Sequence, residues 1–98
     1  MIKRIVKMTF RPEATDIFRA VFDQNKTQIR AFEGCHHLEL WQSRHAPNVF
    51  FTFSIWESEE DLDRYRQSEL FRATWAKTKA LFADKPKAWS VDAIETVE

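Results

Sequence analysis

The sequence predicts an α+β fold in which helices cover one face of an antiparallel β-sheet. Two strand-like segments, residues 35–42 and 49–56, are joined by a polar turn and form a predicted hairpin. Segments with apolar residues at helical spacing precede and follow this hairpin, and a further strand-like segment stands near each end of the chain. The order strand, helix, strand, strand, helix, strand is that of the ferredoxin-like arrangement.

The first strand and the first helix are predicted from apolar periodicity. A strand over residues 2–10 places four apolar side chains on one parity: Ile2, Val6, Met8 and Phe10. Pro12 suits the first turn of a helix, and Gly34 is expected to end that helix. Between them, apolar residues recur at helical spacing: Phe18, Val21, Phe22, Ile29 and Phe32. One long amphipathic helix is therefore expected before the hairpin.

The stretch "WESEEDLDRYRQSELF", residues 56–71, contains the predicted starts of two further helices. Ser58 and Asp61 form a pair typical of a helix N-terminus, and the acidic residues between them favour the positive end of the helix dipole. Ser68 is a second candidate cap, and its helix is expected to end before Pro86. The inward stripe of this last helix is Phe71, Trp75, Thr78 and Phe82.

A last strand over residues 88–95 completes a predicted single domain, residues 1–98. Hydrophobic residues make up 44% of the chain, which is typical of a packed protein and not of a disordered one. Fifteen basic and fifteen acidic residues are interspersed, which disfavours nucleic acid or an anionic membrane as a partner. No apolar run is long enough to span a bilayer, and the lone Cys35 excludes a disulfide framework. A cytoplasmic protein is therefore predicted.

The second strand of the hairpin is apolar on both parities. One parity holds Val49, Phe51, Phe53 and Ile55, and the other holds Phe50 and Trp56. Trp41 and Trp89 stand on the neighbouring strands. Helices can cover only one face of the sheet, and three of these large aromatic residues left in water would approach or exceed the apolar patch of roughly 300–600 Å² that is usual for a monomer. We therefore expect a homodimer packed sheet to sheet, although either parity could face the partner.

Three stretches of the sequence carry a family resemblance. They are "FEGCHHLEL" after the first helix, "FTFSIWESEEDLDRY" where the hairpin leads into a helix, and "YRQSELF", which is similar to a His-x-x-Ser-x-x-Phe helix motif. Together they resemble the antibiotic biosynthesis monooxygenase family of dimeric α/β-barrel domains. The resemblance implies a ligand cavity between helices and sheet. It also implies, in active members, oxidation of phenols, quinols or anthrones by O₂ without metal or flavin.

The chain departs from the patterns of this family at its motif histidine. Tyr65 stands where many relatives carry His, and a phenol does not act as an imidazole base near neutral pH. The haem-degrading branch resembles this chain in architecture and uses an Asn, a Trp and a His that align to Val6, Tyr65 and Trp75. Because all three residues differ, we expect no haem ligation at this place and no cofactor.

Histidine and asparagine supply the candidate polar groups of the site. His37 is the preferred base for deprotonating a phenol, because imidazole titrates near neutrality. His36 and His37 are expected on opposite faces of one strand, so only one can face the helix side. The alternative for either residue is a surface or interface histidine. Asn25 interrupts the apolar stripe of the first helix, and its amide needs a hydrogen-bond partner, which is either backbone or ligand.

The remaining candidates also have a structural alternative. Tyr65 is expected to act with His37 on the substrate, and Phe71 and Trp75 to wall a planar ligand, but aromatics at helical spacing are also typical core residues. Cys35 is interpreted as a small buried hydrophobe. A metal site from Cys35, His37 and His45 lacks a recognised ligand spacing, so no metal is expected.

Two functions are consistent with these residues. The first is a cofactor-independent monooxygenase that oxidises a small phenol, quinol or anthrone-like substrate with O₂. Its predicted catalytic residues are His37 and Tyr65, and its predicted substrate-binding residues are Asn25, Phe71 and Trp75. The alternative is a non-catalytic dimeric module that binds a small aromatic or lipid-like ligand in the same cavity.

Overall fold

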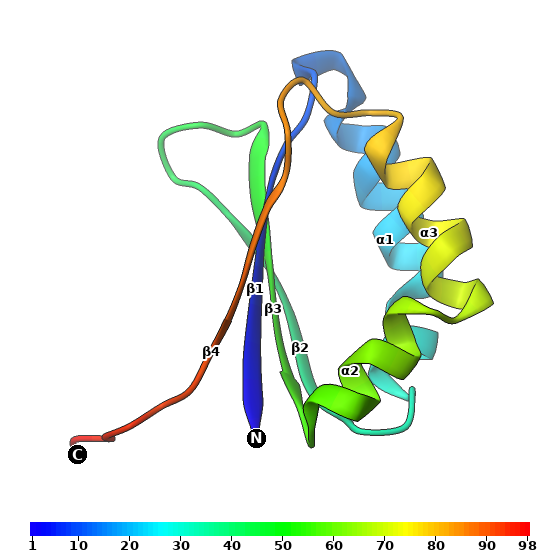
Figure 1. The fold of residues 1–98 in the computed structure, drawn as a ribbon. Helices are drawn as coiled ribbons and strands as arrows, with labels where there is room; N and C mark the ends of the chain where they lie inside the picture. The colour runs from blue at the N-terminus through cyan, green and yellow to red at the C-terminus, as the bar shows by residue number, and fades with distance from the viewer.

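The computed structural model describes residues 1–98 and has the predicted order of elements (Figure 1). Four strands, three α-helices and one short 3₁₀ helix follow one another along the chain. They are β1 (Ile2–Thr9), η1 (Pro12–Ala14), α1 (Thr15–Arg30), β2 (Cys35–Gln42), β3 (Val49–Trp56), α2 (Glu59–Arg66), α3 (Glu69–Lys79) and β4 (Lys87–Val91). The two hairpin strands, β2 and β3, have the bounds predicted from the sequence.

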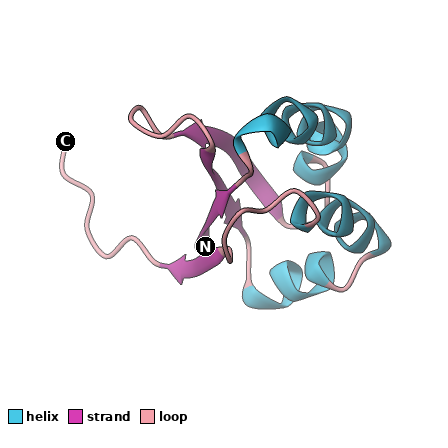
Figure 2. Ribbon diagram, turned by 90° about the horizontal axis from the view of Figure 1, so that it is seen from above, coloured by secondary structure: helices cyan, strands magenta, loops and turns pink.

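The strands form one sheet in the order β2-β3-β1-β4, and every neighbouring pair is antiparallel. All helices lie on one side of this sheet, and no element covers the other side (Figure 2). This arrangement confirms the α+β, ferredoxin-like prediction. We call the side of the sheet that faces the helices the inner face and the opposite side the outer face.

Two apolar clusters fill the space between the inner face and the helices. The first contains Met8, Phe10, Phe18 and Phe50, and the second contains Cys35, Trp56 and Leu62. All seven residues are buried. Because Phe50 and Trp56 are buried on the inner face, the alternation of β3 places Phe51 and Phe53 on the outer face. The structure thereby shows which parity of β3 faces the helices, a question that the sequence left open.

Two serines begin the later helices, as predicted. The Ser58 hydroxyl accepts a hydrogen bond from the Asp61 backbone N–H at 3.2 Å, and the Ser68 hydroxyl accepts one from the Phe71 backbone N–H at 3.1 Å. These bonds satisfy backbone donors that have no partner within the helix. The acidic stretch that begins at Glu59 is therefore the first turn of α2 and belongs to the fold.

Two helix ends differ from the prediction. The helix α1 ends at Arg30, and Gly34 instead forms the turn into β2 with a positive φ of 88°. A Cβ atom at Gly34 would lie 2.4 Å from the Cβ of Asp61, so both the backbone angle and the space require glycine. The helix α3 ends at Lys79, because the chain then turns so that Phe82 forms a β-bridge with Phe10.

The last strand is shorter than predicted. β4 covers Lys87–Val91, whereas the sequence predicted residues 88–95. Val91 pairs with Lys3, at the beginning of β1. The chain beyond Val91 therefore extends past the end of β1, which is the only strand that β4 pairs with. The C-terminal residues then extend away from the helices and from the sheet (Figure 2).

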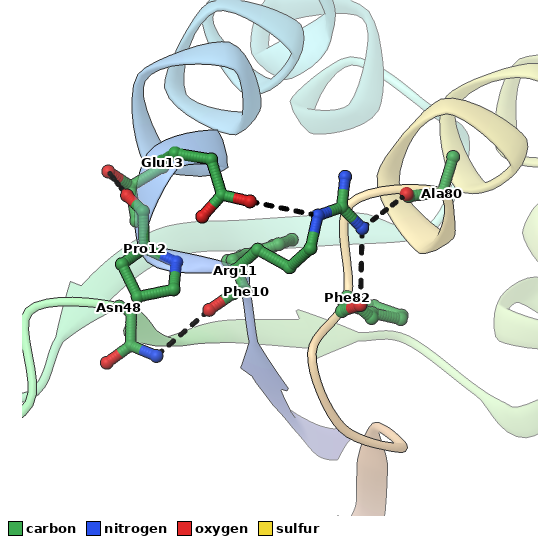
Figure 3. Close-up of polar contacts among 8 residues, drawn as sticks. Phe10, Arg11, Pro12, Glu13, Asn48, Ala80 and Phe82 are labelled. Carbon is green, nitrogen blue, oxygen red and sulfur yellow. Dashed lines mark hydrogen bonds and ion pairs between the residues drawn. The ribbon is translucent and has the colours of Figure 1, made fainter.

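Arg11 ties the start of the helical layer to the end of α3 (Figure 3). Its Nη1 donates to the backbone oxygens of Ala80, at 3.0 Å, and Phe82, at 3.5 Å, and its Nε lies 3.3 Å from Oε1 of Glu13. A cation suits this place because carbonyls at a helix C-terminus have no partner within the helix.

None of the helices combines the length and the hydrophobicity that a membrane span needs.

Candidate functional site

A cavity of about 280 Å³ lies between the inner face of the sheet and the helices. We call it the central cavity. It borders both apolar clusters, and most of its lining is hydrophobic. The sheet contributes Arg4, Val6, Met8, Leu38, Thr52, Ser54, Trp56, Lys87 and Ala88 to the lining, the helices contribute Phe18, Phe22, Ile29, Leu62, Tyr65, Arg66, Phe71, Thr74, Trp75 and Thr78, and Pro86 precedes β4. A concave, largely apolar space with a few polar groups is typical of a small-molecule site.

Three of the five predicted site residues line this cavity together: Tyr65, Phe71 and Trp75. The Phe71 and Trp75 rings are stacked, with centroids 5.8 Å apart and an interplanar angle of 12°. Tyr65 stacks on Trp56, with centroids 4.9 Å apart, and meets Phe71 edge to face. Flat aromatic surfaces on adjacent helices therefore form one wall, as expected for a cavity that binds a planar molecule.

Asn25 is not part of this cavity. Its Nδ2 donates a hydrogen bond to the Val21 backbone oxygen at 2.8 Å, one turn earlier on α1. Of the two partners considered for this amide, the structure supplies the backbone one. Asn25 is thus accommodated within its own helix.

His37 also lies outside the central cavity. It pairs with Ile55 across the sheet, contacts Glu39 on the next outward position of β2, and meets the ring of Phe53 edge to face. His36 is exposed, with its Nε2 3.4 Å from Oε2 of Glu57. The central cavity contains no imidazole, so the base role predicted for His37 is not supported by its position and stays a prediction.

A β-bulge explains the orientation of His37. Cys35 is buried on the inner face opposite Trp56, and regular alternation would give His37 the same orientation. The register shifts between Cys35 and His37, so the extra residue reverses the parity of the rest of β2. Leu38 then lines the cavity, and His37 faces outward.

Thr74 is a polar residue of the cavity that was not predicted from the sequence. Its Oγ1 is buried and has no hydrogen-bond partner in the protein. Thr78, one turn later on α3, donates to the Thr74 backbone oxygen at 2.8 Å and leaves the Thr74 hydroxyl free. The detectable signal was a polar residue beside Trp75 in the inward stripe of α3. A buried hydroxyl without a partner costs free energy, which a ligand's polar group would recover.

Burial changes the acidity of two groups near the cavity. It raises the pKa of the Tyr65 phenol strongly, with a smaller contribution from Cys35, so this hydroxyl stays protonated at neutral pH and acts as a hydrogen-bond donor. No hydrogen bond in the structure uses the Tyr65 hydroxyl. Burial likewise raises the pKa of the Cys35 thiol, which agrees with its interpretation as a small buried hydrophobe.

No group of three or more His, Cys, Asp or Glu side chains is placed to hold a metal ion. Cys35, His37 and His45, the three candidates considered from the sequence, therefore do not form such a group. Cys35 is buried toward the helices, whereas His37 belongs to the outer face.

Comparison with known proteins identifies the family. Residues 1–77 match the family described as antibiotic biosynthesis monooxygenase. The chain belongs to this family. No curated protein matches the sequence significantly.

Several solved structures share this fold. The crystal structure of one antibiotic biosynthesis monooxygenase has a TM-score of 0.91 at 22% identity, covering 97% of this chain and 100% of that one. The protein Rv0793 from Mycobacterium tuberculosis has a TM-score of 0.88 at 23% identity, covering 99% and 98%. A conserved protein from Methanosarcina mazei Go1 has a TM-score of 0.88 at 18% identity, covering 92% and 89%. At these identities the similarity establishes the fold.

Haemin binding tests the predicted alignment of this chain to the haem-degrading branch. Val6, Tyr65 and Trp75, which align to the residues of the haem-degrading branch, all line the central cavity. None of them offers an imidazole or a thiolate to iron, and burial, which raises the pKa of Tyr65, disfavours the phenolate that would bind it. Haemin titration is expected to give no sharp Soret shift and no ascorbate-driven degradation, measured by absorbance. Saturable binding with turnover would contradict the alignment.

Proposed function

We propose that the central cavity binds a small, electron-rich phenol, quinol or anthrone and that the protein is a monooxygenase that oxidises this substrate with O₂. Membership of the family supports the reaction class. The observation that carries the proposal for this chain is the apolar cavity walled by the stacked Phe71 and Trp75 rings, with the free hydroxyls of Tyr65 and Thr74 beside them. That the reaction needs no metal or flavin, and that the protein is cytoplasmic, stay predictions from the sequence.

The cavity residues would position the substrate and exclude water. Phe71 and Trp75 offer a flat surface on which an aromatic ring stacks. Tyr65 donates a hydrogen bond to the substrate oxygen, since its own raised pKa keeps its proton in place. Thr74 provides a second polar contact. Bulk water would intercept a reactive oxygenated intermediate, and the hydrophobic lining keeps it out.

The proposed reaction is balanced with O₂ as the only oxidant. An anthrone methylene loses two hydrogens and four electrons and gains one oxygen atom as a carbonyl. The second oxygen atom leaves as water with those two hydrogens. The lining contains no histidine and no acidic side chain, so the substrate loses its proton to solvent before it enters the cavity and not to a protein base.

Oxygen consumption tests this function. Purified protein without added metal or flavin should consume O₂ with a panel of hydroquinones and anthrones faster than a boiled control. The rate should rise with pH through the pKa of the substrate, because the Tyr65 phenol remains protonated over that range. Tyr65→Phe removes one hydrogen bond to a charged group, worth about 1.5–3 kcal/mol, and should lower the rate at least about tenfold. A panel no faster than the boiled control would contradict the proposal.

The alternative function is a non-catalytic module that binds a small aromatic ligand. It is favoured by the absence of an imidazole from the cavity, where Tyr65 stands at the position of the family's motif histidine. The same panel separates the two functions. Compounds that raise the melting temperature through binding but are not oxidised would identify the module.

We also infer that two copies of the chain pack through their outer faces. This face carries Ile5, Phe51, Phe53 and Ile55, together with Trp41 and Trp89, which are 39% and 45% exposed. Trp41 stacks on Phe53 with ring centroids 5.0 Å apart. No helix covers these residues (Figure 2). A second copy packed on the outer face would remove these side chains from water.

A further inference from the structure

The central cavity is electrically unbalanced although the whole chain is not. The sequence holds fifteen basic and fifteen acidic residues. The cavity lining, however, includes Arg4, Arg66 and Lys87 and no acidic residue. Lys87 pairs with Lys7, which has the parity of the outer face, so its side chain points away from the cavity. Arg4 and Arg66 are therefore the two cations that a bound ligand would meet.

Arg4 is a cation on the inner face without an anionic partner. It has the same parity as Val6 and Met8 and pairs with Ser54 on one side and Ser90 on the other. Its Nη1 donates to the Ser90 hydroxyl at 3.0 Å, and none of the ion pairs in the structure includes Arg4. A half-buried guanidinium with five donors and one neutral partner has donors left for an anion.

Arg66 brings a second guanidinium to the same end of the cavity. It comes from the last turn of α2 and pairs with Asp63, one turn earlier. Burial, and next the charge of Arg66, lower the pKa of Arg4, while Asp63 acts in the opposite direction. The single carboxylate of Asp63 therefore balances only one of the two guanidinium charges of Arg4 and Arg66. The repulsion between the two arginines would be relieved by a further negative charge between them.

The far end of the cavity is apolar. Met8 stands four residues after Arg4 on the same face of β1, which is about 13 Å along a strand. Around Met8 the lining consists of Phe18, Phe22 and Trp75. The cavity therefore has a cationic end and an aromatic end, separated by roughly the length of a two- or three-ring aromatic molecule.

We propose that the ligand of the central cavity is an aromatic carboxylate, whose anionic group accepts hydrogen bonds from Arg4 and Arg66 while its rings lie against Phe71 and Trp75. The inference rests on the cavity assigned under the proposed function and adds the charge of the ligand. A planar carboxylate matches the geometry of the guanidinium fork. The hydrophobic surroundings strengthen the interaction relative to one in water.

A pair of probes that differ in charge tests this inference. 2-Naphthoate and its neutral analogue 2-naphthamide are titrated into the full chain, with binding followed by calorimetry. 2-Naphthoate should bind at least about tenfold more tightly, and its affinity should fall as salt concentration rises. Arg4→Gln and Arg66→Gln should each reduce naphthoate affinity about tenfold and change naphthamide affinity less than about twofold.

Arg72→Gln is the matched control. It removes a guanidinium group from α3 by the same substitution. Arg72 is exposed and does not line the cavity, so naphthoate affinity should not change. Equal affinities for the two probes, binding of neither probe, or arginine variants that weaken both probes equally would overturn the inference. Circular dichroism shows whether each variant is folded, and Arg66 is exposed on a helix, so its variant remains informative if Arg4→Gln does not fold.

The probes also separate this inference from the proposed function. Neither naphthalene carries a phenol that O₂ could oxidise, so their binding does not depend on catalysis. Charge-selective binding without O₂ consumption in the hydroquinone panel would leave the inference standing and reject the monooxygenase. Hydroquinone oxidation without charge-selective binding would support the monooxygenase and reject the carboxylate ligand.

Discussion

Replacing Phe53 by aspartate is expected to convert a dimer into a monomer. Phe53 lies near the middle of the outer face, between Glu39 on β2 and Ile5 on β1, and stacks on Trp41. In the proposed symmetric dimer the change would bury two carboxylates between the outer faces, and each unpaired buried charge costs several kcal/mol. The dissociation constant should rise by at least about 100-fold.

Sedimentation at micromolar concentration measures this result. The unmodified protein should have twice the 11.7 kDa chain mass, and Phe53→Asp should have the mass of one chain. Ile17→Asp provides a control, because Ile17 is an exposed apolar residue of α1 and so belongs to the helical layer and not to the outer face, and this variant should remain dimeric. A monomeric unmodified protein, or a dimeric Phe53→Asp variant, would contradict packing through the outer face.

Replacing Trp56 by alanine is expected to remove a large part of the stability of the fold. Trp56 is 1% exposed, stacks on Tyr65, and donates from Nε1 to the Ser54 hydroxyl at 3.0 Å. Deleting a buried aromatic side chain of this size costs about 3–5 kcal/mol, a large part of the 5–15 kcal/mol typical of a domain. The melting temperature should fall by roughly 12 °C or more.

Urea unfolding of both proteins at one fixed concentration measures the difference in free energy, since self-association would make stability depend on concentration. Trp56→Phe serves as the control, because it keeps an aromatic ring against Tyr65 and loses only the indole hydrogen bond and part of the volume. It should lose less than half as much stability. A loss below about 1 kcal/mol in Trp56→Ala would show that the packing around Trp56 is not a main source of stability.

The sequence alone determined the elements of the fold because their signals are local. The polar turn between two strand-like segments indicated the bounds of the hairpin strands, and the Ser58 and Ser68 hydroxyls, which cap backbone donors, marked two helix starts. The order of these elements then permits few topologies. Tyr65, Phe71 and Trp75 were found for the same reason, since their spacing places them on the inward side of α2 and α3.

Tertiary structure decided which polar residues reach the cavity. A single extra residue at the bulge after Cys35 turns His37 from the helix side to the outer face, and no local sequence pattern predicts this bulge. Asn25 bonds to its own helix, which sequence alone did not distinguish from a ligand contact. Arg4 and Arg66 are far apart in the chain and line the same cavity only because α2 packs against β3, which pairs with β1, so their shared charge is a property of the folded molecule.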